Sequence, residues 1–238
     1  MAPLISTDRV INGERQFWSE INAILAGGAS RICDVGGGAK PILSLDRIEE
    51  LGLDYVVLDE SEEELDRTPD GYQRFHASIL DRAAVARLVE QGPFDAVLTR
   101  WTAEHVPDGK LFHEEVFTML RPGGVALHYF PTLYSLPFLV NRLLTPAASE
   151  SVLYRLFPSR KVKFRPYYSW CRGPTRGQLR RLEALGYSVE RYTGYFGHGN
   201  YRQVKPLDAV QRALTNWLVE HPQPLLTSFA LVVLRRPP

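Results

Sequence analysis

The sequence contains little cysteine. Two cysteines occur in 238 residues, Cys33 and Cys171, and they are far apart along the chain. Two such residues provide no disulfide framework of the kind that small secreted domains use, and no group of cysteine and histidine has the spacing of a zinc site. We therefore expect reduced thiols, a cytoplasmic protein and no bound metal.

Long apolar runs and a strong charge of one sign are also missing. No stretch reaches the roughly 18 apolar residues that a membrane span needs, and the start of the chain lacks the basic and apolar regions of a signal peptide. The formal net charge of +1 gives no overall attraction to nucleic acid. With 45% hydrophobic and 23% charged residues, the composition is that of a globular protein. The length predicts a single α/β domain over 1–238, with room for an inserted lobe.

The most informative stretch is a glycine turn near the amino terminus. Residues 31–35 suit a strand that is buried on both faces, and Gly36, Gly37 and Gly38 follow it. Consecutive glycines allow positive φ and leave the backbone bare, so that a ligand can lie against it. Pro41 fits the first position of a following helix, expected over 41–51. A strand, a glycine turn and a helix in this order predict a site for a nucleotide-like ligand.

The residues around this turn exclude two common nucleotide motifs. A dinucleotide-binding fingerprint would need glycine where Pro41 stands, and a Walker phosphate loop would need Ser or Thr after Lys40. Asp34, at the end of the strand, instead favours a ligand that carries positive charge. The plainer alternative is a glycine turn that only joins a strand to a helix.

A second acidic residue stands one strand later. The run 54–59 has the composition of a strand and ends in Asp59, about 20 residues after the glycines. In a doubly wound fold, a carboxylate at this place can accept hydrogen bonds from both ribose hydroxyls. Several glutamates follow Asp59, so a solvated acidic strand end is the alternative.

Strands and helices alternate along most of the chain. Further strands are expected over 72–77, 94–99, 125–130, 187–192 and 225–234, and helices over 8–26, 82–90, 108–120, 175–186 and 207–219. This alternation predicts an α/β fold with a parallel sheet. Residues 131–174 interrupt the pattern and are expected to form an inserted lid or substrate-binding region.

Four motifs in the same order resemble the class I S-adenosylmethionine-dependent methyltransferases. They are Asp-Val-Gly-Gly-Gly at 34–38, the acid at 59, the segment with Glu-His-Val at 100–108, and Leu-Arg-Pro-Gly-Gly at 120–124 before an apolar strand. The resemblance covers nearly the whole chain. It implies a Rossmann-like, seven-stranded, mostly parallel sheet flanked by helices, with an antiparallel edge pair and with the lid between strands five and six.

The resemblance also implies a cofactor and the residues that hold it. S-adenosyl-L-methionine would be bound and S-adenosyl-L-homocysteine released. The implied cofactor-binding residues are Asp34, Gly36, Gly37, Gly38, Asp59, Ala77, Ser78, Ile79 and Arg100. The family often has aspartate where Ser78 stands, which leaves a hydrogen bond to the adenine amine unassigned. Lys40 either reaches the cofactor carboxylate or points to solvent.

The sequence constrains the acceptor less than the cofactor. Residues 155–181 contain nine arginines and lysines, no acidic residue and five interleaved aromatic residues. Such a segment suits nucleic acid, an anionic or phosphorylated sugar, or a solvated basic rim. The apolar run 133–144 is too short to cross a bilayer but allows peripheral membrane contact. A weaker resemblance, over 130–171 and 194–198, to bacterial surface-glycan methyltransferases favours a small-molecule or glycan acceptor and O-methylation of its hydroxyl.

Methyl transfer to a hydroxyl requires a group that removes the hydroxyl proton, and histidine suits this role near neutral pH. His105 follows the fourth strand and His128 ends the fifth, at the carboxyl ends where ligands bind in open α/β sheets. His198 lies in the loop after the sixth strand. These three histidines are the candidate general bases, and a structural role is the alternative for each.

Other functions remain open at this point. A methyltransferase for another metabolite, for RNA or for protein would use the basic segment for docking. Residues 99–102, however, lack the Asn/Asp-Pro-Pro-Tyr motif that base N-methyltransferases often carry after the fourth strand. A ligand-binding protein without catalysis is disfavoured because both Asp34 and Asp59 are present. The sequence does not indicate an oligomeric state.

Overall fold

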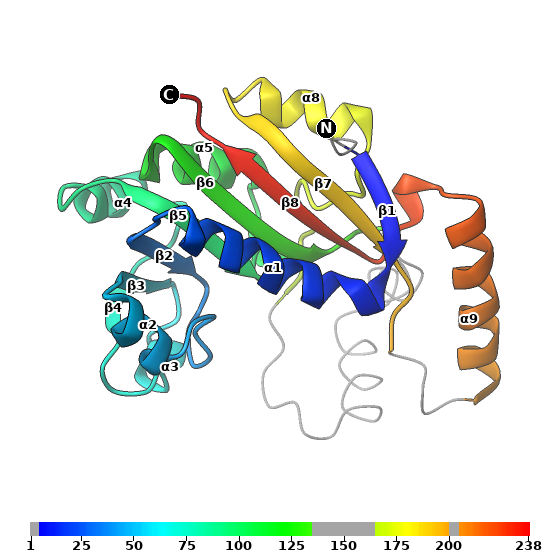
Figure 1. The fold of residues 1–238 in the computed structure, drawn as a ribbon, viewed down its shortest axis with the longest axis horizontal. Helices are drawn as coiled ribbons and strands as arrows, with labels where there is room; N and C mark the ends of the chain where they lie inside the picture. Colours follow the sequence, from blue (N-terminus) through cyan, green and yellow to red (C-terminus); the bar gives the residue numbers. More distant parts are fainter. Residues whose placement is uncertain (1–4, 135–164, 200–204) are drawn as a thin grey trace.

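The structure is a computed structural model, and it describes residues 5–134, 165–199 and 205–238. One mixed sheet of eight strands runs through it, in the order β1-β7-β8-β6-β5-β2-β3-β4 (Figure 1). The strands are β1 (Ile5–Arg9), β2 (Arg31–Val35), β3 (Asp54–Asp59), β4 (Gln73–His76), β5 (Phe94–Arg100), β6 (Leu120–Pro131), β7 (Ser188–Phe196) and β8 (Phe229–Arg235).

The carboxyl ends of β2, β3, β4 and β5 lie along one edge of the sheet. These strands pair in parallel, and β6 pairs in parallel with β5. β8 is antiparallel to both of its neighbours, β6 and β7. The glycine turn, Asp59 and the segment after β5 therefore lie at the same edge of the sheet, because parallel strands end on the same side.

The strand β1 corrects two expectations. We predicted seven strands and a helix over 8–26, whereas Ile5–Arg9 forms an eighth strand and the helix α1 (Gly13–Ala26) begins later. β1 adds to the edge of the sheet by pairing in parallel with β7, where Ile5 lies opposite Tyr192. This partner is more than 180 residues away in the sequence, so no local pattern reveals it.

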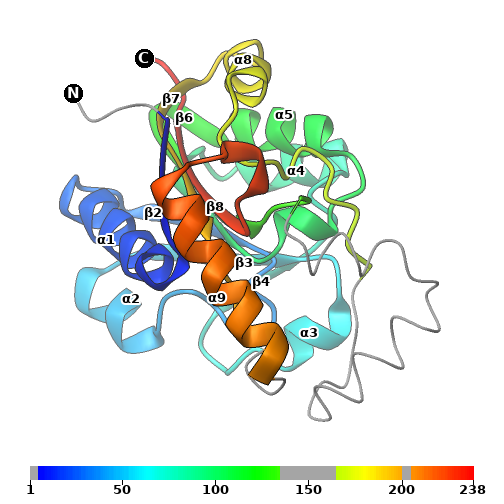
Figure 2. The ribbon, with the colours of Figure 1, turned by 90° about the vertical axis from the view of Figure 1, so that its right-hand side faces the viewer.

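Helices cover both faces of the sheet, and Figure 2 shows the two layers on either side of it. The helices are α2 (Leu45–Leu51), α3 (Glu62–Asp66), α4 (Arg82–Val89), α5 (Gly109–Met119), α8 (Arg176–Glu183) and α9 (Lys205–Glu220), together with α1 and the 3-10 turns η1 (Val10–Asn12), η2 (Ala103–His105) and η3 (Pro224–Leu226). α1 contributes Phe17 and Ile21 to one apolar core. α4, α5 and α8 supply the other, and its members include Val85 and Phe112.

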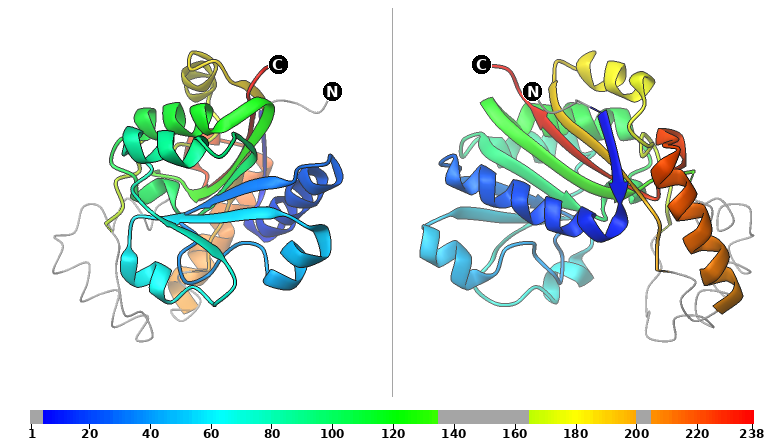
Figure 3. Two further views of the ribbon diagram at one scale, coloured as in Figure 1. Left: turned by 90° about the vertical axis from the view of Figure 1, so that its left-hand side faces the viewer. Right: turned by 45° about the vertical axis from the view of Figure 1, so that its right-hand side comes forward.

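The central strands are buried on both faces, as their apolar composition predicted. Along β3, Tyr55 and Val57 pack into the core beside α1, while Val56 and Leu58 pack into the core beside α4 and α5. Alternation of side chains across a pleated strand produces this division. Figure 3 shows the same sheet from two further sides, with α9 lying apart at its β1–β7 end.

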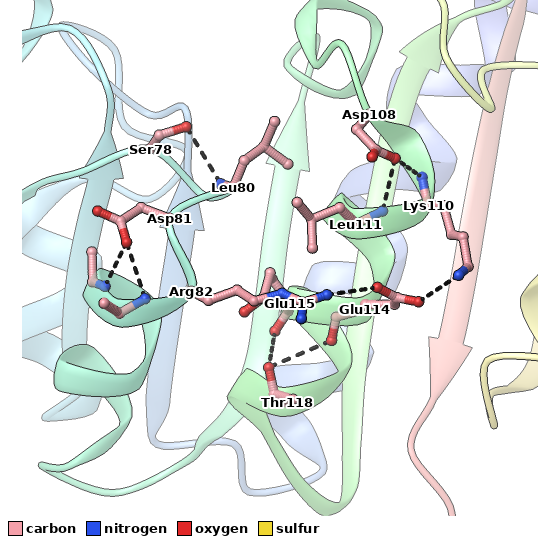
Figure 4. Close-up of polar contacts among 12 residues, drawn as sticks. Ser78, Leu80, Asp81, Arg82, Asp108, Lys110, Leu111, Glu114, Glu115 and Thr118 are labelled. Carbon is pink, nitrogen blue, oxygen red and sulfur yellow. Dashed lines mark hydrogen bonds and ion pairs between the residues drawn. The ribbon is translucent and has the colours of Figure 1, made fainter.

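Short polar side chains set the starts of several helices. Asp81 Oδ1 accepts from the backbone N–H groups of Ala83 and Ala84 at the start of α4, and Asp108 Oδ1 does the same for Lys110 and Leu111 at the start of α5 (Figure 4). Thr175 caps α8, as expected. These bonds satisfy amide groups that have no partner within the helix.

The helix expected over 41–51 is shorter than predicted. It begins at Leu45, because Ser44 has extended backbone and accepts a hydrogen bond from the N–H of Arg47. Pro41 therefore lies in the loop after the glycine turn and not at the start of a helix. Residues 41–44 thus form a loop between the glycine turn and α2.

The predicted lid over 131–174 falls mostly on residues 135–164, outside the described residues. So do most of the apolar run 133–144 and the first part of the basic segment 155–181. Within the described ranges, no helix is both long enough and apolar enough to cross a membrane. Cys33 and Cys171 are buried free thiols.

Candidate functional site

The glycine turn is a tightly packed corner that only glycine can form. Gly36 and Gly38 have φ of 77° and 38°. A Cβ on Gly36 would lie 2.4 Å from the Thr102 hydroxyl oxygen, and one on Gly38 would lie 2.9 Å from Asp59 Oδ2. The Gly36 N–H donates to the carbonyl of Leu58 at 2.7 Å. The turn thus presents bare backbone between the ends of β2, β3 and β5.

Asp34 lies beneath this turn as a buried carboxylate. Its Oδ2 accepts hydrogen bonds from the Ile42 N–H and the Tyr55 hydroxyl, both at 2.7 Å. Its Oδ1 is buried and has no hydrogen-bond partner. Burial raises the pKa of Asp34 to about 6. A cation placed near this oxygen would favour the charged form, so the carboxylate suits a positively charged ligand.

Asp59 ends β3 at the same edge. Its Oδ1 accepts from the Ser61 N–H at 2.9 Å, and its pKa is raised, chiefly because the carboxyl is partly buried. The remaining oxygen, Oδ2, lies near Gly38. A carboxylate held in this way presents its acceptor atoms to the space beside the turn.

A cavity of about 590 Å³ joins these groups. It is lined by every residue that the sequence predicted to bind cofactor: Asp34, Gly36, Gly37, Gly38, Asp59, Ala77, Ser78, Ile79 and Arg100. Lys40 lines the cavity as well, and it is an exposed residue at its rim. The segments that follow β2, β3, β4 and β5 meet here, as expected for the carboxyl edge of a parallel sheet.

The segment after β4 forms one wall. The Ala77 N–H donates to the carbonyl of Asp59 at 3.1 Å, which ties the segment to the end of β3. The Ser78 hydroxyl donates to Glu60 Oε2 at 3.1 Å and accepts from the Leu80 N–H at 3.3 Å. Ser78 therefore stabilises the wall itself, while Ala77 and Ile79 add apolar surface.

Arg100 and Trp101 form the opposite wall, and sequence analysis missed Trp101. The Arg100 guanidinium lies 5.2 Å from the centre of the Trp101 ring and 5.9 Å from that of Trp18. Trp101 is 48% exposed and has φ of 59°, a left-handed backbone that is unusual for a bulky residue. Its N–H donates to the carbonyl of Tyr129 at 2.8 Å, which holds this conformation. No sequence pattern predicts such a backbone.

The three candidate histidines have very different positions. His105, in η2, lines the cavity. His198 is not among the cavity-lining residues and interacts with Gln211 of α9. The described contacts of His198 therefore lie away from the cavity lining, and its role as a base stays a prediction.

The position of His128 does not suit a general base. Its side chain is fully buried in β6, where Nδ1 lies 2.9 Å from the Thr99 hydroxyl and the ring packs against Phe112 and His113. Burial lowers its pKa well below the ordinary value. His128 lies three residues before the end of β6 at Pro131 and is paired with Thr99 on one side and Val232 on the other, so the imidazole lies inside the sheet and not at its edge.

A second hollow, of about 760 Å³, lies between α4 and α5, away from the glycine turn. Its charged rim is internally paired: Arg82 lies 3.3 Å from Glu114 and 3.2 Å from Glu115, and Lys110 lies 3.0 Å from Glu114 (Figure 4). It contains none of the strand-end residues that the motifs predict. Its larger volume therefore does not make it the functional site.

Comparison with known proteins points to the part of the chain that contains the cavity-lining residues. Residues 33–128 match a family model described as a methyltransferase domain. No curated protein matched the sequence.

Solved structures share the fold over nearly the full length. A SAM-dependent methyltransferase from Archaeoglobus fulgidus is 14% identical, with a TM-score of 0.55 and coverage of 93% of each chain. A protein described as a sarcosine dimethylglycine methyltransferase from Galdieria sulphuraria is 14% identical, with a TM-score of 0.56 and coverage of 95% of this chain and 86% of the other. A methyltransferase from Mesorhizobium loti is 19% identical, with a TM-score of 0.53 and coverage of 92% and 97%. These identities establish the fold alone.

The residues of the cavity fit S-adenosylmethionine. The turn has no Cβ atoms to fill the space, and the buried Asp34 Oδ1 lacks a partner that a cationic ligand would supply. Asp34 and Asp59 offer carboxylates, and Ala77 and Ile79 offer apolar surface. Residues 33–128 thus match a methyltransferase domain, and the cavity that they help to line has the groups that S-adenosylmethionine requires.

Proposed function

We propose that this enzyme methylates a hydroxyl group of a sugar or glycan-type acceptor, with His105 as the general base. The observation that carries the proposal is the position of His105, which lines the same cavity as the glycine turn, Asp34 and Asp59. Among the three candidate histidines, it alone lines that cavity.

The proposed roles follow from the geometry of the cavity. Asp34 holds positive charge at the turn, Asp59 accepts from ribose hydroxyls, and Ala77 with Ile79 flanks the adenine. Arg100 is placed to bind the cofactor carboxylate. When bound, the cofactor supplies an electrophilic methyl group, so that most of the protein's work is to position the acceptor in line with it.

The hydrogen bond of His105 leaves Nε2 as the nitrogen that would take the acceptor proton. Its Nδ1 lies 3.2 Å from the backbone carbonyl of Arg165. Because a carbonyl only accepts, Nδ1 carries the hydrogen of the neutral ring, and the lone pair resides on Nε2. An acceptor hydroxyl next to Nε2 would lose its proton to this atom as its oxygen attacks.

Trp101 supports a sugar as the acceptor class. Its exposed ring stands at the wall of the cavity, on a strained backbone that is maintained by a hydrogen bond. Residues in sparsely populated backbone conformations concentrate at functional sites. A broad aromatic face offers apolar contact for the C–H face of a pyranose ring.

RNA and protein remain the competing acceptors. In the described part of the basic segment, Arg165 lies over Tyr167, Arg172 over Tyr134 and Arg181 over Trp170. In these contacts the three guanidinium groups lie over aromatic rings of the same chain. We therefore favour a small sugar-type acceptor over RNA or protein.

The test is transfer of a labelled methyl group from S-adenosylmethionine by the full chain. Glycans, lipid-linked sugars, small metabolites, RNA and protein are offered separately, and the methylated atom is determined. We expect O-methylation of a sugar-type acceptor, and a reduction in turnover of about 100-fold or more in His105→Gln, the scale of general base catalysis. His221→Gln, at an exposed histidine outside the cavity, is the matched control. Transfer only to RNA or protein, or full turnover by His105→Gln, would overturn the proposal.

A further inference from the structure

Glu104 is a buried carboxyl that the proposed reaction has not yet used. Its side chain is 4% exposed, and Oε2 has no hydrogen-bond partner. Its backbone carbonyl accepts from the N–H groups of Tyr167 and Tyr168, at 2.7 and 2.9 Å, so that η2 is fixed against the segment 165–171. A carboxyl in this position is costly to ionise unless a positive charge lies next to it.

Among the described residues, His105 is the group beside Glu104 that can become positive. Its Nε2 lies 3.7 Å from Glu104 Oε1, on the ring nitrogen that holds the lone pair. His105 lines the cofactor cavity, and Glu104 does not. Glu104 therefore lies beside Nε2 but outside the cavity lining, where it can respond to the charge of the ring.

The other titratable groups near Glu104 do not supply this charge. Tyr168 and Cys171 lie near it, and the pKa of both is raised, first by burial and then by the charge of Glu104. The Arg172 guanidinium donates to the backbone carbonyls of Tyr168 and Cys171. Burial raises the pKa of Glu104 to about 8, which is consistent with a carboxyl that lacks a permanent cation.

We propose that Glu104 is a positioning residue for methyl transfer, whose carboxylate stabilises the imidazolium that His105 becomes when it takes the acceptor proton. This inference rests on the proposed function. In the step, the hydroxyl oxygen forms a bond to the methyl carbon, and the electron pair of the broken carbon–sulfur bond stays on sulfur. The hydroxyl proton moves to Nε2. The new positive charge then lies beside the Glu104 carboxyl, where it favours the ionised form of that group and is stabilised by it.

The test measures the proton affinity of His105 and needs no acceptor. The full chain is labelled with ¹³C-histidine, the His105 signal is assigned by its loss in His105→Gln, and its chemical shift is followed against pH by NMR. In Glu104→Gln, which keeps the shape and removes the charge, we expect the His105 midpoint to fall by at least one pH unit. Glu104→Asp, with a shorter carboxylate, should give a midpoint between the two, and it serves as the test if Glu104→Gln does not fold.

The matched control is Glu115→Gln, which changes another largely buried glutamate that lies on α5 and faces Arg82. It should leave the His105 midpoint where it is in the wild type. Midpoints that agree within 0.3 pH units in wild type, Glu104→Gln and Glu104→Asp would overturn the inference. Because the measurement needs no methyl transfer, it is separate from the acceptor screen: a failed screen overturns the proposed function, and an unmoved midpoint overturns only the role of Glu104.

Discussion

Burial shifts the pKa values of several individual residues, in and near the site. Asp34 and Glu104 are acids with pKa values raised by burial, to about 6 and about 8, while His113 has its pKa lowered to about 3 by the same cause. Sequence analysis identified Asp34 from its place before the glycines. Sequence analysis named Glu104 only as part of a motif. The burial of Glu104 depends on the segment 165–171, which is about 60 residues away along the chain.

The charge of Asp34 should control cofactor binding. In Asp34→Asn, the amide oxygen can still accept from Ile42 and Tyr55, but the negative charge is lost. We expect the Kd for S-adenosylmethionine, measured by calorimetry, to rise at least tenfold, about 1.4 kcal/mol. Asp54→Asn, at the opposite end of β3, should bind as the wild type does. An unchanged Kd in Asp34→Asn would show that this carboxylate does not hold the ligand's positive charge.

The same carboxylate predicts how cofactor binding depends on pH. The bound cation favours ionised Asp34, and the pKa of this group in the free protein is about 6. Affinity should therefore be constant well above pH 6 and fall as the pH drops below it, by up to tenfold per unit. Asp34→Asn should show a flatter profile over the same range. A wild-type profile that stays level down to pH 5 would contradict the assignment.

At the scale of elements, helix starts were predictable where a short polar side chain supplies the cap. The expected starts of α4, α5 and α8 agree with the capping bonds of Asp81, Asp108 and Thr175. The start of α2 was misplaced because Pro41 fits the first position of a helix, while Ser44 provides the actual cap. β1 was missed because the strand with which it pairs, β7, follows it by most of the length of the chain.

Loss of one cap should destabilise the fold measurably. Asp81 accepts from two N–H groups of α4, at 3.0 and 3.1 Å. We expect Asp81→Ala to lower the free energy of unfolding in urea by about 1 kcal/mol, and Asp81→Asn to recover most of that loss. Equal losses in the two variants would show that the cap is not the cause.

For the whole molecule, buried ionisable groups have opposing effects on acid stability. His113 and His128 lie in one core with Phe112, and their rings are 5.2 Å apart. Their lowered pKa values mean that the unfolded chain takes up protons first, so their contribution weakens as the pH falls below about 6.5. Asp34 and Glu104 have raised pKa values, so they are protonated first in the folded state and oppose this loss.

Removing one histidine should isolate its effect. Relative to the wild type, His113→Gln should gain stability as the pH is lowered from 6.5 toward 4, by about 1.4 kcal/mol per pH unit. The measurement is the free energy of unfolding against pH, with the exposed His221→Gln as control. A difference between His113→Gln and wild type that does not change with pH would mean that His113 is not held neutral in the folded state.

The amino-acid sequence by itself determined the α/β class and the residues of the cofactor cavity. Those features depend on neighbours in the chain: a strand, a glycine turn and an acid at set spacings, which a parallel sheet then aligns at one edge. Tertiary structure decided which histidine lines the cavity, because His128 is buried between β5 and β8 while η2 places His105 at the wall. Tertiary structure also decided the strained backbone conformation of Trp101 and the burial of Glu104. Both depend on segments that meet only when the chain folds.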